Sequence, residues 1–149
     1  MASTKPLGVI GYDPFGPHLA GPPRRCLALA TRLAAILPVV LWAEGEVPGP
    51  LPANLEVKTL DPDAICAAAS GYAGLLLPAQ AALRDRRWFA VSCPVIVDCF
   101  DPFPLETAAI LQGASKPEVE FRTRLGAWAS LHAVVHGDYW LVANDTQRA

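Results

Sequence analysis

Three segments of this sequence gather residue types that could bind a ligand or take part in catalysis. The first is a glycine-rich turn over 11–21, followed by Pro22, Pro23, Arg24 and Arg25. Such a turn before a helix lets a ligand approach the backbone and can bind an anion. It is neither G-x-G-x-x-G nor a phosphate loop ending in Gly-Lys-Ser/Thr, and its prolines carry no N–H. The alternative is a structural turn with both arginines on a solvated face.

The second segment supplies three carboxylates at the end of an apolar run. Asp98, Asp101 and Glu106 follow residues 94–97, and Pro102 stiffens the turn between them. Acidic groups at the carboxyl end of a buried strand can orient hydroxyl groups or act as a base. The alternative is that Asp98 accepts hydrogen bonds from local backbone and Asp101 starts an Asx turn.

The third segment is 143–148, where Asp145 and Arg148 follow the last expected strand; a helix N-cap explains Asp145 equally well. His132 and His136 have the four-residue spacing of a metal pair, but no third ligand is evident, so we expect no metal site. The sequence also lacks G-x-S-x-G and a nicotinamide-binding fingerprint, which disfavours a serine hydrolase and predicts no cofactor.

Composition limits the classes of protein that could carry these segments. The chain has 149 residues, of which 52% are hydrophobic and 17% charged, and this balance excludes a disordered chain. A net charge of −2 argues against a nucleic-acid partner. The four cysteines form no C-x-x-C, which favours a reduced, cytoplasmic protein. Neither a membrane-spanning run nor a leader peptide is apparent.

The elements that must position these segments follow from the apolar runs. Six short runs predict strands, at 7–12, 38–43, 55–60, 73–77, 94–100 and 139–143. Helical patterns lie between them, at 22–37, 61–70, 81–90 (the weakest) and 115–135. This alternation predicts an α/β domain, a single Rossmann-like unit over residues 1–149 whose sheet is mostly parallel and flanked by helices.

Several details of packing can be predicted as well. We expect Asp61 to cap its helix, and Ser115 and Glu118 to form a capping box. The long helix should bury one apolar stripe, made of Phe121, Leu125, Trp128, His132 and Val135. The strands covered on both faces should bury Val9, Ile10, Leu76, Leu77, Val95, Ile96 and Val97.

Four stretches together resemble a known family. They are Ala20-Gly-Pro-Pro-Arg-Arg25, Asp98-Cys-Phe-Asp-Pro-Phe-Pro-Leu-Glu106, Gly137-Asp-Tyr-Trp140 and Ala143-Asn-Asp-Thr-Gln-Arg148. In this order they resemble the N-terminal half of a GT-B glycosyltransferase, in the family 4-like group of bacterial polysaccharide enzymes. Asn144-Asp145 stands where that group usually has Ser-Glu, and Cys99-Phe100 where it has Leu-Tyr.

The resemblance implies the acceptor-side domain of a hexosyltransferase that acts in polysaccharide biosynthesis on a glycan or lipid-linked acceptor. The nucleotide-sugar donor would bind to a C-terminal domain or partner chain, so the chain alone should be inactive. The implied catalytic residues are Asp101 and Asp98, and the implied substrate-binding residues are Gly21, Arg24, Arg25, Glu106, Asp145 and Arg148.

A non-catalytic α/β interaction or regulatory module derived from such an enzyme is the alternative. We expect a cytoplasmic protein, free or at the inner face of the membrane. The helix that begins at Thr146 is expected to be cut short at Ala149 and to leave apolar surface for self-association or a partner.

Overall fold

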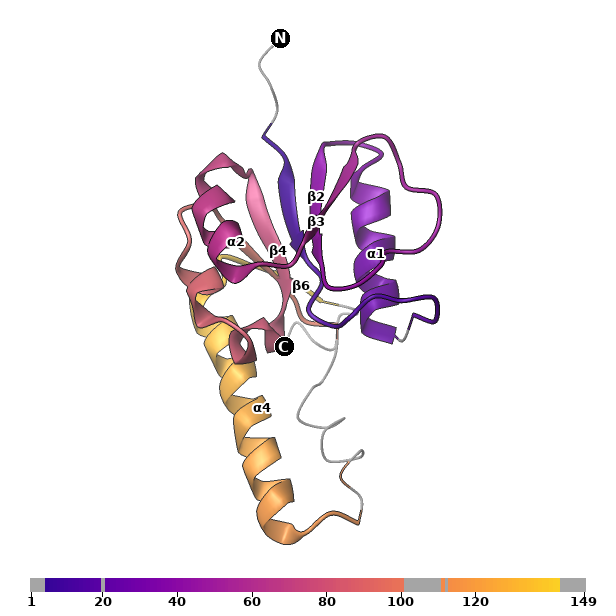
Figure 1. The fold of residues 1–149 in the computed structure, drawn as a ribbon. Helices are drawn as coiled ribbons and strands as arrows, with labels where there is room; N and C mark the ends of the chain where they lie inside the picture. Colours follow the sequence, from indigo (N-terminus) through magenta and orange to yellow (C-terminus); the bar gives the residue numbers. More distant parts are fainter. Residues whose placement is uncertain (1–4, 20, 101–110, 112, 143–149) are drawn as a thin grey trace.

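Short apolar runs form the strands of one sheet, as their composition predicts. The computed structural model describes residues 5–19, 21–100, 111 and 113–142, and over these the chain forms six parallel strands in the order β3-β2-β1-β4-β5-β6 (Figure 1). The strands are β1 (Leu7–Ile10), β2 (Val39–Ala43), β3 (Leu55–Thr59), β4 (Gly74–Pro78), β5 (Val95–Asp98) and β6 (Tyr139–Leu141). The predicted α/β class and all six predicted strands are therefore confirmed, with ends one to two residues shorter in most cases.

Helices connect the strands and cover both faces of the sheet. The α-helices are α1 (Gly21–Leu33), α2 (Pro62–Ala68) and α4 (Lys116–His136). Three short 3₁₀ segments complete the described elements, namely η1 (Ala69–Gly71), η2 (Ala79–Leu83) and η3 (Arg86–Ala90). The predicted helix over 81–90 is wrong in type, because the chain there forms two tight turns broken near Asp85, whose side chain accepts a hydrogen bond from the Arg87 N–H.

The core consists of two clusters, one on each face of the sheet. Successive strand residues point to opposite faces, so Val9 and Leu41 join the cluster beneath α1, while Ile10 and Trp42 join the cluster beneath α2, η2, η3 and α4. The predicted core residues are buried except Ile96, which is half-buried. The edge strand β6 leaves Tyr139, Trp140 and Leu141 exposed, so apolar side chains reach the surface at this end of the sheet.

Helix α4 buries a different face from the one predicted. The predicted stripe of Phe121, Leu125, Trp128, His132 and Val135, called the α4 stripe below, is exposed except for the partly buried His132, with Phe121 and Val135 each 64% exposed. The face that packs on η2 is made of small residues, which are Gly126, Ala129 and Ala133. The prediction is wrong because it weighted large apolar residues, whereas the close approach of α4 to the alanines of η2 leaves room only for small ones.

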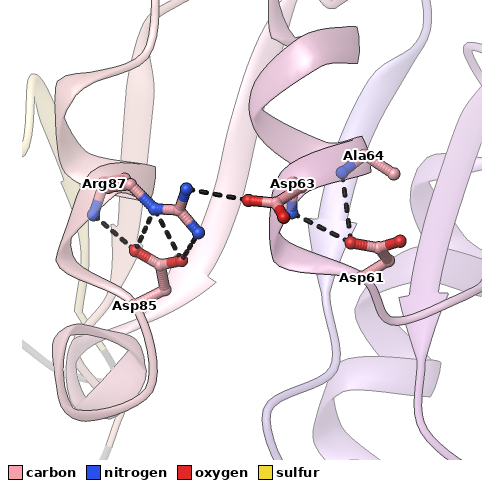
Figure 2. A network of polar contacts seen from close by, with 5 residues as sticks. All are labelled: Asp61, Asp63, Ala64, Asp85 and Arg87. Atoms are coloured by element: carbon pink, nitrogen blue, oxygen red, sulfur yellow. Dashed lines mark hydrogen bonds and ion pairs between the residues drawn. The ribbon is translucent and has the colours of Figure 1, made fainter.

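The two predicted helix caps have different outcomes. Asp61 caps α2, where its carboxylate accepts hydrogen bonds from the N–H groups of Asp63 and Ala64, at 2.9 and 3.2 Å (Figure 2). Ser115 occupies the N-cap position of α4, but its side chain makes no capping hydrogen bond, so the predicted capping box is wrong. Among the described residues, no helix combines the length and the apolar character needed to cross a membrane.

Candidate functional site at the carboxyl edge of the sheet

The candidate site lies where the strand order changes direction beside β1. Strand β2 lies on one side of β1 and β4 lies on the other. The connections that leave β1 and β4 therefore run in opposite directions from the carboxyl edge of the sheet. Ligands of open α/β sheets bind in the crevice that forms at such a point. A pocket is present there, and its polar lining comes from Tyr12, Asp13, Gln80 and Asp98, with Pro22, Pro23 and Phe100 among its apolar walls.

An ion pair joins Asp98, which lines this pocket, to Arg25 beside it. Arg25, in the second turn of α1, donates from Nε to Asp98 Oδ2 and from Nη2 to Asp98 Oδ1, each at 2.8 Å. Two parallel bonds of this kind are the strongest arrangement that a guanidinium and a carboxylate can make. The Phe100 ring also lies 4.7 Å from the guanidinium carbon of Arg25. The ion pair thus fixes the start of α1 to the end of β5.

The environment of this pair is only partly open to solvent. The Asp98 side chain is 8% exposed and that of Arg25 is 32% exposed. The hydrogen bonds that Arg25 donates to Asp98 raise the pKa of Arg25, while partial desolvation acts in the opposite direction. The pair occupies one lone pair on each carboxylate oxygen, and a carboxylate accepts about four hydrogen bonds. Asp98 therefore keeps the capacity to accept from a ligand hydroxyl while Arg25 holds it in place.

The loop after β1 brings a second carboxylate into the pocket. Burial of Asp13 raises its pKa. The pKa of Tyr12 is raised mainly by its own burial and, to a smaller extent, by the charge of Asp13. Arg84 fixes this loop because it donates to the Tyr12 carbonyl at 3.2 Å and to Glu44 Oε2 at 2.8 Å. The two acidic groups that line the pocket make it a poor site for an anion and a better one for hydroxyl groups.

The neighbouring turn after β2 is held against the same loop. Phe15 N–H donates to the Glu44 carbonyl at 2.7 Å, and Phe15 forms an isolated bridge with Gly45. Gly45 has a φ of +84°, and a Cβ at this position would lie 2.4 Å from the Phe15 carbonyl oxygen. A glycine is therefore required at position 45, both for its backbone conformation and for the close contact.

The sequence did not single out two polar residues of the pocket, Gln80 and Asp13, and Gln80 is the more deeply placed in the alanine-rich turn after β4. It is 8% exposed, lines the pocket, and its side chain forms no hydrogen bond with the described residues. The clue was its place directly after the apolar strand β4, because polar residues at the carboxyl ends of parallel strands face ligands. Asp13 had the same clue, since it follows β1 within the glycine-rich turn.

The remaining predicted site residues do not all reach the pocket. Gly21 begins α1, and Arg24 is exposed, with its only described hydrogen bond a long one of 3.4 Å to the Leu19 carbonyl. The other four predicted residues lie outside the described residues and remain predictions; they are Asp101, Glu106, Asp145 and Arg148. The described structure thus brings Arg25 and Asp98 together and leaves Arg24 apart from them.

A second polar cluster links α2 to η3 and has a structural explanation. Arg87 donates to Asp85 Oδ2 at 2.6 Å and to Asp63 Oδ1 at 2.8 Å, as Figure 2 shows. The hydrogen bond from Arg87 lowers the pKa of Asp85, and the two carboxylates raise the pKa of Arg87. One guanidinium is shared between two carboxylates, so the cluster joins α2 to the start of η3.

The paired histidines of α4 form an aromatic stack. The His132 ring lies 4.3 Å from that of His136 and 5.3 Å from that of Trp128, measured between centroids. Burial, and then the charges of His136 and Arg86, lower the pKa of His132. No group of three or more metal-ligating side chains occurs in the part of the chain that the structure describes.

Comparisons of this chain with protein-family models, with curated proteins and with solved structures gave no match. The function must therefore be inferred from the arrangement of the residues themselves.

Proposed function

We propose that this chain is the acceptor-side domain of a glycosyltransferase that acts in polysaccharide biosynthesis. It would transfer a hexose from a nucleotide-sugar to a glycan or lipid-linked acceptor in the cytoplasm. The donor would be held by a companion domain or partner chain. Within this proposal, the pocket at the carboxyl edge of the sheet receives part of the acceptor.

The observation that carries the proposal is the contact between Arg25 and Asp98. Arg25 closes the Ala-Gly-Pro-x-x-Arg stretch and Asp98 opens the Asp-Cys-Phe-Asp-Pro-Phe stretch, and these two stretches carry most of the family resemblance. They lie 73 residues apart in the chain, yet their charged side chains meet with two hydrogen bonds of 2.8 Å. A site assembled from both stretches is what the glycosyltransferase hypothesis requires.

The chemistry of the pocket agrees with a hydroxylated acceptor. Asp13, Gln80 and Tyr12 can exchange hydrogen bonds with a hydroxyl group, and the pocket, with a volume of about 30 Å³, has room for one such group at the edge of an acceptor sugar rather than for the whole ring. In this proposal Asp98 positions Arg25 and the turn beyond β5. Asp101, three residues further on, is then the carboxylate proposed to meet the reacting hydroxyl.

Reconstitution of the two-domain enzyme would test this function. The chain would be mixed with a donor-binding domain from a glycosyltransferase of the resembled family, a panel of labelled nucleotide-sugars (UDP-glucose, UDP-galactose and GDP-mannose) and a lipid-linked glycan extract. We expect transfer only when both domains are present. Asp101→Asn should lower turnover at least about tenfold, or about 1.4 kcal/mol of barrier, with an unchanged melting temperature.

Glu46→Gln provides the matched control, because Glu46 is an exposed carboxylate that also follows a strand at the carboxyl edge. Transfer by this variant should equal that of the unmodified chain. Absence of transfer with every donor, or equal turnover for Asp101→Asn, would contradict the proposal.

An interaction module without catalysis is the second candidate, and the exposed α4 stripe is the observation that favours it. The two candidates differ in the reconstitution experiment, because an interaction module should bind a partner without supporting sugar transfer.

A further inference from the structure

Strand β3 forms one edge of the sheet, and one side of its backbone faces no other described strand. It is five residues long, contains neither proline nor glycine, and pairs with β2 along its whole length without a bulge. Natural proteins commonly shield an edge with a proline, a bulge or a very short strand, because its free N–H and C=O groups can pair with another chain. Strand β3 has none of these three protections.

The hydrogen bonds to β2 determine which backbone groups of β3 lie on the open side. The Asn54 carbonyl accepts from the Val39 N–H at 2.9 Å, and the Leu60 N–H donates to a carbonyl at the end of β2, also at 2.9 Å. Because successive strand residues direct their N–H and C=O groups to opposite sides, the even-numbered residues of β3 bond to β2 and the odd-numbered residues face outward. The N–H and C=O groups of Val57 and Thr59 therefore lie on the open side, where no described loop or helix backbone bonds to them.

Two opposite charges lie next to each other on this edge. Glu56 and Lys58 project from the same face of β3, and Lys58 Nζ lies 3.4 Å from Glu56 Oε1. Their side chains are 62% and 41% exposed, so both can reach a second strand that pairs with β3. Val57, between them, projects from the other face and is itself partly exposed. The edge therefore carries no net charge that would repel a second copy of itself.

We propose that β3 pairs in antiparallel orientation with β3 of a second copy of this chain, with Val57 opposite Val57. The two Val57 residues exchange both of their N–H···O=C bonds, and the Thr59 N–H of each copy donates to the Leu55 carbonyl of the other. The two sheets become one continuous sheet, and a twofold axis between the strands closes the assembly as a dimer. This inference does not depend on the proposed glycosyltransferase function.

Charge complementarity selects this register. With Val57 at the centre, Glu56 of each copy lies opposite Lys58 of the other, at the non-hydrogen-bonded positions where opposed side chains are closest. The backbone allows only shifts that keep odd-numbered residues opposite odd-numbered residues. The nearest such shift in one direction places Glu56 opposite Glu56, and in the other direction it places Lys58 opposite Lys58. Like charges directly opposite each other are unfavourable, so the side chains favour the register centred on Val57.

The order of the charges also argues for a second copy rather than an unrelated strand. A partner strand must present a cation opposite Glu56 and an anion opposite Lys58, and β3 turned around has this arrangement. The ion pair within each strand is compatible with the two pairs between the strands. The four side chains then form a cluster in which each charge lies between two charges of opposite sign.

The small size of the contact predicts a weak dimer. A stable interface buries roughly 1,200–2,000 Å² in total, whereas the five residues of β3 span only about 17 Å of one edge. We therefore expect a dissociation constant of about 0.1–1 mM, so that the dimer is populated only at high concentration.

Sedimentation equilibrium of the 149-residue chain between about 10 μM and about 1 mM would test the dimer. The unmodified chain should pass from monomer toward dimer. Glu56→Lys and Lys58→Glu should each weaken association at least about tenfold, because like charges then face each other in both cross-strand pairs. Association should return when the two variants are mixed, and also in the double variant Glu56→Lys, Lys58→Glu, because each lysine then lies opposite a glutamate.

Glu120→Lys is the matched control for the change in net charge. Glu120 is exposed on α4, which packs on η2, η3 and β5 and therefore lies toward the other edge of the sheet. This variant should dimerise as the unmodified chain does. Circular dichroism of every variant would show that a loss of association is not a loss of folding.

Amide hydrogen exchange measured by NMR would report on the backbone pairing itself. The N–H groups of Glu56 and Lys58 are protected by β2 at every concentration, whereas those of Val57 and Thr59 are protected only in the dimer. Near 1 mM, exchange at Val57 and Thr59 should be about twofold to fivefold slower than in dilute solution, in proportion to the remaining fraction of monomer. Exchange at Glu56 and Lys58 should not change.

Four results would overturn the proposal. They are a chain that stays monomeric up to about 1 mM, which would leave this edge to a strand of another protein, equal weakening by Glu120→Lys and the two β3 variants, no return of association in the mixture or the double variant, and exchange at Val57 that does not depend on concentration.

Discussion

Arg25 neutralises a carboxylate that is nearly removed from solvent at the end of β5. Because the Asp98 side chain is only 8% exposed, removal of its partner would leave a buried charge without compensation. Arg25→Met should lower the free energy of unfolding by about 2–3 kcal/mol, near the lower limit for buried pairs because Arg25 itself is partly exposed. Urea denaturation measured by circular dichroism would give the change.

Arg24 offers the control for that experiment within the same helical turn. It is exposed and makes only a 3.4 Å hydrogen bond, so Arg24→Met should change stability by no more than about 0.5 kcal/mol. Equal effects at the two positions would mean that the ion pair contributes little to folding.

Cys26, a buried thiol beside the same site, should make the fold less stable at alkaline pH. Burial, and then the charges of Asp98 and Asp13, raise the pKa of the Cys26 thiol from 9.0 to about 12. Above pH 9.0 the unfolded chain releases this proton while the folded chain retains it. The contribution of Cys26 to the free energy of unfolding is therefore fully present below pH 9.0 and is lost as the pH rises further. The loss cannot exceed about 1.4 kcal/mol for each pH unit from this one group.

Urea denaturation at about pH 8 and about pH 10, for the unmodified chain and for Cys26→Ala, would isolate this contribution. Other buried thiols and phenols act in the same direction, so the unmodified chain should lose stability and Cys26→Ala should lose less. Parallel curves for the two chains would exclude Cys26 as a contributor.

At the residue scale, sequence reasoning identified Arg25 and Asp98 but not their contact. Arg25 was chosen because it follows a glycine-rich turn at the start of a helix, and Asp98 because it ends a buried strand; local pattern can show both positions. Their pairing joins groups 73 residues apart, and it depends on the placement of β1 beside β4 and of β4 beside β5. That placement is a property of the whole sheet. Gln80 was missed because a single amide in an alanine-rich turn has no distinctive pattern of its own.

At the element scale, α4 shows how residue size decides which face of a helix is buried. Leucine and alanine both favour helices, so Ala129→Leu tests packing rather than helix propensity. Ala129 is fully buried against its neighbours, and three extra carbons there should destabilise the fold by about 1–3 kcal/mol. Thermal or urea denaturation would measure this cost.

Ala127→Leu makes the identical change on an exposed position of the same helix, and it should be nearly neutral. A similar loss of stability in both variants would show that the packing of α4 on η2 is not close. The same comparison explains the error in the sequence prediction. Apolar residues lie on more than one side of α4 itself. Hydrophobic periodicity alone therefore could not distinguish the face packed on its own domain from the α4 stripe.

At the scale of the whole molecule, the alternation of strands and helices was sufficient to predict the class of fold. Unbroken apolar runs such as Val95-Ile-Val97 identified strands covered on both faces, and β5 is indeed an interior strand of the sheet. The edge strands were less distinctive. In β3, four of five residues are at least partly exposed, yet the strand pairs fully with β2, which only the folded arrangement reveals.

The architecture of the carboxyl edge also predicts how the chain responds to an anionic ligand. Helix α1 begins at Gly21, and the next two residues are prolines, so two of its four free N–H groups are missing. Asp13 and Asp98 line the pocket, and the two cations that contact its lining are already paired, Arg25 with Asp98 and Arg84 with Glu44. We therefore expect the chain alone to bind UDP-glucose more weakly than about 1 mM, or about −4.1 kcal/mol, in calorimetry.

Asp98→Asn turns this expectation into a directional test. The variant leaves Arg25 without its carboxylate partner beside the pocket, so binding of inorganic phosphate or UDP-glucose should strengthen by at least about tenfold, or about 1.4 kcal/mol. In the double variant Asp98→Asn, Arg25→Met the gain should disappear, because the liberated guanidinium is its cause. Micromolar binding to the unmodified chain would instead mean that the α1 terminus accepts phosphate despite its prolines, and that the donor side of the reaction lies in this domain.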